Sequence, residues 1–218
     1  MNQTKITVKI YEPLLKAFNE KIEDNFIKRD AFLNHMLKSE VSHLAEEMKG
    51  LKLSGCARRY ISGELKRLGT KTINVVVDKE TSEKLQSVVK QTNMVRDAFV
   101  NRLILLLLSP DGFLEMLDLP NEIEDKYFSS AEKMPTSPMK GIESIVFDPL
   151  FYLRLETEQQ GKGLYLLELS PKLMGLSCYI NNSGVPGTDE YKKENEALIP
   201  LEDIWHDSLY MNQRKEAH

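Results

Sequence analysis

The chain has little of what signals metal binding, disulfide bonding or catalysis. Among its 218 residues are only two cysteines and four histidines. Cys56 and Cys178 lie far apart and lack the close Cys and His spacing of a zinc site, so we expect reduced thiols in a cytoplasmic protein. The sequence contains no phosphate-binding loop, HExxH pair, nucleophile elbow or CxxC pair. We therefore predict neither enzymatic activity nor a cofactor.

Long apolar runs and targeting signals are also lacking. Residues 103–108 form an apolar run of six, far short of the roughly 20 residues that cross a bilayer. The polar residues 1–4 lead straight into an alternating segment, which predicts no signal peptide. We expect no membrane association. The apolar run is typical of the buried end of a core helix, covered by the C-terminal half or by a second chain.

The net charge of −4 is unevenly distributed along the chain. Residues 1–110 carry 19 Lys and Arg against 13 Asp and Glu, a charge of +6, whereas residues 111–218 carry 10 against 20, a charge of −10. Such asymmetry is typical of a nucleic-acid-binding surface joined to an acidic module. Because +6 is only mildly basic, we expect modest non-specific affinity for DNA.

The basic half contains one pattern twice, 67 residues apart and without a gap. The tetrapeptide Arg-Asp-Ala-Phe occurs at residues 29–32 and again at residues 96–99. The other matched positions are Ile6 with Ile73, Val8 with Val75, Ile10 with Val77, Phe18 with Leu85, Ile22 with Val89, Asn34 with Asn101 and Leu37 with Ile104. A repeat of this kind indicates a supersecondary unit that cannot bury its apolar face alone. Two copies predict a pseudo-dimer.

Each copy predicts a strand followed by two helices. Residues 5–10 alternate polar and apolar side chains, which is the period of a half-buried strand. Glu12-Pro13 then marks a helix start, and a second helix is expected from Lys28. In the second copy we expect a strand at 72–77 and helices at 79–90 and 95–108. Two such units can close a core by pairing their strands antiparallel, within one chain or between two chains.

At these positions the chain resembles the ribbon-helix-helix proteins of the MetJ/Arc superfamily. The resemblance rests on residues 5–10, 13–15, 27–30, 72–77 and 95–97. It covers residues 1–45 and 70–110, about 40% of the chain. It implies an α+β fold, a tandem ribbon-helix-helix pseudo-dimer in residues 1–110. Its copies are residues 4–48 and 71–109, joined by a basic linker helix at 50–69.

The resemblance also implies that the two-stranded ribbon enters the major groove of double-stranded DNA. Its outward side chains would then read bases: Lys5, Thr7, Lys9, Thr72, Asn74 and Val76. Lysine donates to guanine, asparagine pairs with adenine, and threonine offers a hydroxyl or a methyl group. The alternative is that these residues form the solvent-exposed face of an ordinary antiparallel sheet and bind nothing. Val76 departs from the family pattern, where a polar residue is expected, so the two half-sites would differ.

Basic residues near the second helices are the candidate phosphate contacts. A helix N-terminus favours an anion, and Lys28, Arg29 and Arg96 lie at such ends. Arg58 and Arg59 belong to the linker helix and are further candidates. The alternative interpretation is solvated charge for Arg29 and Arg96 and a solvated spanning helix for the linker. Asp30 and Asp97 are expected to be structural, because a carboxylate in the first turn suits the helix dipole.

The C-terminal half carries no motif that indicates a family. Residues 111–140 are acidic and then rich in proline and serine, which predicts a linker after a short helix at 113–117. Residues 141–218 are expected to form a small acidic β-rich domain. Its predicted strands are residues 144–147, 151–156, 164–169 and 176–180, and the middle two would form a hairpin around Gly161 and Gly163.

These observations lead to one hypothesis and one alternative. The chain is expected to be a sequence-specific DNA-binding protein, a transcriptional repressor or autoregulator. Residues 111–218 would bind a protein partner or support a homo-oligomer. In the alternative, the chain is an antitoxin-like, defence-system, plasmid or phage accessory protein. It would then use ribbon-helix-helix units mainly as a dimerisation scaffold, and its DNA binding would depend little on salt.

Overall fold

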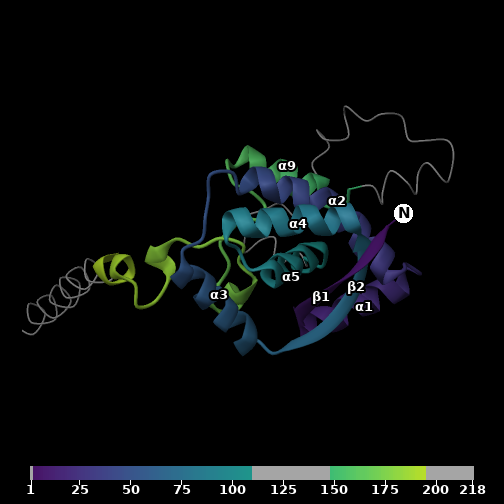
Figure 1. Ribbon diagram of the computed structural model, residues 1–218, viewed down its shortest axis with the longest axis horizontal. Helices are drawn as coiled ribbons and strands as arrows, with labels where there is room; N and C mark the ends of the chain where they lie inside the picture. Colours follow the sequence, from purple (N-terminus) through teal and green to yellow (C-terminus); the bar gives the residue numbers. More distant parts are fainter. Residues whose placement is uncertain (1, 110–147, 195–218) are drawn as a thin grey trace, which may run out of the picture.

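The computed structural model describes residues 2–109 and 148–194. Over these residues the fold is mixed α+β, mostly helical, with one two-stranded antiparallel sheet (Figure 1). The elements are β1 (Gln3–Tyr11), α1 (Glu12–Asp24), α2 (Arg29–Glu47), α3 (Gly55–Arg67), β2 (Thr70–Asp78), α4 (Lys79–Thr92), α5 (Arg96–Leu107), α9 (Phe151–Gln159) and two 3₁₀ helices, η1 (Pro171–Leu176) and η2 (Asn182–Gly184).

The individual elements predicted within residues 1–110 are confirmed. Both strands extend one to two residues beyond the expected ends, and α1 has its proline in the first turn. The linker helix α3 begins after Ser54, whose hydroxyl accepts the backbone N–H of Ala57 at 3.0 Å. This N-cap satisfies a donor that the first turn leaves unpaired.

Strands β1 and β2 pair with each other inside one chain. Their antiparallel register places Thr7 opposite Asn74. Five of the six inward side chains are buried and Ile73 is partly buried, and the outward side chains alternate with them along each strand. The inward-facing set is Ile6, Val8, Ile10, Ile73, Val75 and Val77. A one-residue slip would expose this whole set, so the apolar pattern fixes the register.

The free edge of each strand is covered by a helix from the other strand-helix-helix segment. Asn34 on α2 accepts the backbone N–H of Asp78 at 2.8 Å. Asn101 on α5 accepts the backbone N–H of Tyr11 at 2.8 Å and donates to the carbonyl of Lys9 at 2.8 Å. An uncovered strand edge would present unpaired N–H and C=O groups. The two asparagines, 67 residues apart, therefore interlock the halves.

The C-terminal segment differs from the sequence prediction, because residues 151–156 belong to helix α9. Residues 148–194 contain no strand, so the predicted hairpin and the predicted strand at 176–180 are wrong. Phe151, Leu153 and Leu155 alternate in sequence, but the buried positions Leu150, Arg154 and Thr157 follow helical spacing. The predicted elements at 113–117 and 144–147 and the linker at 111–140 lie outside the described residues.

Residues 148–194 share one hydrophobic core with residues 2–109. The rings of Phe99 on α5 and Tyr165 lie 5.2 Å apart, and η1 packs against α3 and α5. Gly175 in η1 is required there, because a Cβ atom would lie 2.4 Å from the backbone nitrogen of Leu65. The apolar end of α5 is thus covered by the C-terminal half, which is one of the two coverings expected from the sequence, the other being a second chain.

The turns that follow α1 and α4 each contain one residue in the left-handed backbone region. These residues are Phe26 (φ 57°) and Asn93 (φ 56°), again 67 positions apart. Asparagine adopts this conformation readily, whereas a bulky residue is strained in it. Phe26 is also 96% exposed, so its ring offsets none of that strain by burial.

Replacing Phe26 with asparagine should therefore raise the free energy of unfolding by about 1 kcal/mol. Chemical denaturation followed by circular dichroism measures this change. Phe26→Ala is the matched control, because it removes the ring but keeps a residue that disfavours the left-handed region. An equal gain for alanine and asparagine would assign the effect to the exposed ring instead of the backbone.

Candidate nucleic-acid interface

The outward face of the ribbon brings together the six residues predicted to read bases. The cross-strand pairs are Lys5 with Val76, Thr7 with Asn74 and Lys9 with Thr72. Five of the six side chains are exposed, and Val76 is partly buried. The Thr7 hydroxyl donates to Oδ1 of Asn74 at 2.9 Å. The face therefore carries two ammonium groups that flank a polar centre.

Arg29 and Arg96 lie beside this centre, one on each edge of the ribbon. Arg29 ion-pairs with Asp30 at 2.8 Å and donates to the backbone carbonyl of Asn74 at 3.3 Å. Arg96 ion-pairs with Asp97 at 3.2 Å and donates to the backbone carbonyl of Thr7. Only 34% and 33% of the two side chains are exposed. They brace the ribbon, and only their exposed parts remain for a phosphate.

A groove opens beside each of these arginines. The groove at the start of α5 has a volume of about 550 Å³, and its charged residues are Arg58, Lys90, Arg96 and Asp97. The groove at the start of α2 has a volume of about 510 Å³, and its charged residues are Glu23, Lys28, Arg29 and Asp30. The exchange of Glu23 for Lys90 at matched positions, together with Arg58, makes the α5 groove the more basic one.

The remaining predicted phosphate contacts occupy different places. Lys28 is exposed immediately before α2. Arg58 reaches from α3 to Oδ1 of Asn93 at 2.8 Å and so joins the α5 groove. Arg59 is exposed on the same helix but lines a separate groove with Asp189 and Glu190. The structure therefore groups Arg58 with Arg96 and sets Arg59 apart.

Three residues at the strand edges and in the α5 groove were not among those predicted from the sequence. Asn34 and Asn101 cap the strand edges, and Lys90 lines the α5 groove. The two asparagines had a signal in the sequence, since they recur at the repeat interval of 67 residues. Asp30 has a further role that its helix position did not reveal, because its carboxylate accepts the backbone N–H of Val76 at 3.3 Å.

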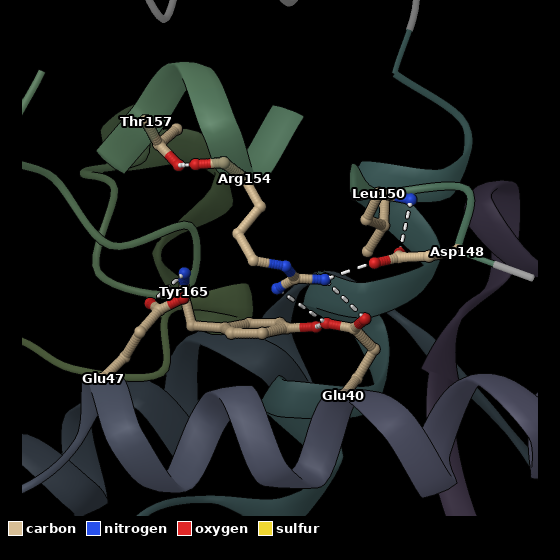
Figure 2. Close-up of polar contacts among 7 residues, drawn as sticks. All are labelled: Glu40, Glu47, Asp148, Leu150, Arg154, Thr157 and Tyr165. Carbon is tan, nitrogen blue, oxygen red and sulfur yellow. Dashed lines mark hydrogen bonds and ion pairs between the residues drawn. The ribbon is translucent and has the colours of Figure 1, made fainter. Parts of the chain in front are cut away.

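A second polar cluster, formed by Glu40, Glu47, Asp148, Arg154 and Tyr165, joins α2 to the C-terminal segment (Figure 2). The guanidinium of Arg154 lies 2.7 Å from Oε1 of Glu40 and 3.6 Å from Oδ1 of Asp148. The Tyr165 hydroxyl donates to Glu40, and the Tyr165 backbone N–H donates to Glu47 at 2.7 Å. The Glu40 side chain is fully buried. The cluster ties α9 to α2, and α9 lies on the side of α2 away from the ribbon (Figure 1).

Burial shifts the titration of several groups at this junction. It raises the pKa of Glu47, an effect opposed by the Tyr165 N–H that the carboxylate accepts. It raises the pKa of the Cys178 thiol to about 12 and lowers that of the Arg102 guanidinium. Arg102 donates to the carbonyls of Leu164 and Leu167, at 3.2 and 2.8 Å. These contacts hold the C-terminal segment against α5.

Residues 2–109 and 148–194 contain no group of three or more His, Cys, Asp or Glu side chains that could hold a metal ion. Within the same residues, no helix is long and apolar enough to cross a membrane. The cysteines are unpaired, with Cys56 exposed and Cys178 buried.

Comparison with protein-family models, with curated proteins and with solved structures gives no significant match. A function for this chain is therefore inferred from the chemistry of the ribbon and of the two grooves beside it.

Proposed function

We propose that this chain is a sequence-specific double-stranded DNA-binding protein that reads the major groove with the β1–β2 ribbon. In this proposal its two strand-helix-helix segments are a tandem ribbon-helix-helix pseudo-dimer. The observation that carries the proposal is the strand register. Thr7 pairs with Asn74, and these two residues are also 67 positions apart in the repeat. A residue that pairs with its own repeat equivalent marks the centre of a pseudo-twofold axis.

The contacts around the ribbon follow the same symmetry. Arg29 and Arg96 bond the backbone of the two central residues, and Asn34 and Asn101 bond backbone N–H groups at matched strand ends. Reading DNA with a paired ribbon requires both strands, and here one chain supplies them. A second copy is therefore not needed to complete the reading face.

The chemistry of the face suits a major groove. Lys5 and Lys9 can donate to guanine O6 and N7, Asn74 can pair with adenine, and Val76 can pack on a thymine methyl group. Arg58, Lys90 and Arg96 in the α5 groove would contact backbone phosphates. Five of the six outward side chains are exposed while residues 148–194 pack against the helices, so that segment leaves the ribbon accessible. A transcriptional repressor that controls its own promoter is the function we favour.

Fluorescence anisotropy with the full chain tests the proposal. The probes are a duplex from the chain's own upstream promoter and a scrambled duplex of the same composition. We expect strong preference for the promoter and an affinity that falls steeply with salt, because phosphate contacts release counterions. Equal, feeble and salt-independent binding to both would contradict the proposal and favour the alternative, a protein-interaction module that uses the paired segments as a scaffold.

A further inference from the structure

We propose that Thr7 is a positioning residue, which orients the Asn74 amide to read an adenine at the centre of the bound DNA site. This inference rests on the proposed function and specifies the base at the centre of the ribbon. Neither residue alone indicates it, because either side chain could simply lie on the solvated face of an antiparallel sheet. The indication comes from their pairing across the ribbon, where the two side chains are hydrogen-bonded to each other.

The two side chains meet at the midpoint of the reading face. They are cross-strand partners, both are exposed, and the Thr7 hydroxyl donates to Oδ1 of Asn74 at 2.9 Å. This bond orients the amide, since its oxygen end lies toward Thr7. Oδ1 keeps a second lone pair, and Nδ2 keeps its N–H donors.

An acceptor beside a donor is the pattern that complements adenine. In the major groove adenine presents N7 as an acceptor and N6–H₂ as a donor, whereas guanine presents two acceptors, N7 and O6. An Asn74 amide fixed by Thr7 would pair with adenine through Oδ1 and Nδ2. Against guanine its Oδ1 would face another acceptor. The central base pair is therefore predicted to be A·T, with the lysine contacts on either side.

The backbone under the pair is also held in place. Arg96 donates to the carbonyl of Thr7 and Arg29 donates to the carbonyl of Asn74, each from the start of a helix. A base-contacting residue whose side chain and backbone are both held in place before binding loses less conformational entropy when it binds. Loss of the Thr7 hydroxyl should thus reduce base discrimination more than it reduces general affinity for DNA.

The experiment uses the full chain in four variants, Thr7→Val, Thr7→Ser, Asn74→Ala and the double Thr7→Val, Asn74→Ala. The probes are duplexes that the wild-type chain selects from a random library, and versions with each central base pair exchanged. We expect the wild type to prefer A·T at one central position by about tenfold or more. Thr7→Val should lose most of this preference and Thr7→Ser should keep it, while the melting temperature of each is unchanged.

The double variant separates positioning from direct contact. If Thr7 acts through Asn74, then Thr7→Val should add nothing to Asn74→Ala. Additive losses would overturn the inference by assigning Thr7 its own base contact, and an unaltered preference in Thr7→Val would overturn it as well. Failure of the library to yield any preferred sequence would instead contradict the proposed function, and the inference with it.

Discussion

Replacing Arg154 with leucine should lower the free energy of unfolding by about 3–5 kcal/mol, the largest stability loss that we expect from a single substitution. Arg154 and Glu40 form a buried ion pair with an N–O distance of 2.7 Å, and the Glu40 side chain is fully buried. Removing the guanidinium leaves a buried carboxylate that still accepts the Tyr165 hydroxyl but has lost its charged partner. Urea denaturation followed by circular dichroism measures the change.

Two further variants test whether the loss in Arg154→Leu comes from an unpaired buried charge. The double variant Glu40→Leu, Arg154→Leu should recover much of the loss, because the penalty arises from an unpaired buried charge and not from the absence of an ion pair. Lys16→Ala breaks an exposed pair with Glu20 and should cost less than about 1 kcal/mol. A loss in Arg154→Leu no larger than that in Lys16→Ala would show that the Glu40 cluster does not hold the C-terminal segment.

The elements of residues 1–110 could be predicted from the sequence because local patterns decide them. Alternation at residues 5–10 and 72–77 places the strands, and the proline at residue 13 fixes a helix start. The side of the ribbon that faces outward follows from the same alternation. Lys5, Thr7 and Lys9 therefore lie on the expected face, and no long-range information was needed to put them there.

The C-terminal segment could not be predicted, because its conformation depends on partners far along the chain. A short apolar run is compatible with a strand or a helix, and residues 151–156 alternate like a strand. What decides between them is Arg154, which must lie against Glu40, 114 positions earlier. Glu40 itself looks like a solvated residue on a polar helix face. The residues that neighbour Glu40 and Arg154 in the sequence do not indicate that either side chain is buried.

The phosphate candidates were only partly predictable, for a related reason. The Arg-Asp-Ala-Phe repeat draws attention to Arg29 and Arg96, but identity between two copies cannot separate a ligand contact from a structural one. In the structure both arginines bond the ribbon backbone and keep about a third of their side chains exposed. Lys90 becomes a candidate only because α4 and α3 meet beside α5.

Replacing Lys5 and Lys9 together with alanine should abolish preference for the specific DNA site while leaving the fold intact. Each lysine points away from the core, so the melting temperature should stay unchanged. Loss of two base contacts worth about 1–3 kcal/mol each should weaken specific binding by roughly 30-fold or more. Anisotropy with the promoter and scrambled duplexes, at one fixed salt concentration, measures both affinities.

The matched control is Lys162→Ala with Lys172→Ala, which removes the same charge from exposed positions in the C-terminal segment. Because the net charge falls equally in both variants, a general electrostatic effect would weaken both by the same factor. We expect the control to keep its promoter preference, since its lysines lie outside the reading face. Equal losses in the two variants would show that only net charge matters. Unaltered promoter affinity without Lys5 and Lys9 would remove the ribbon from the interface.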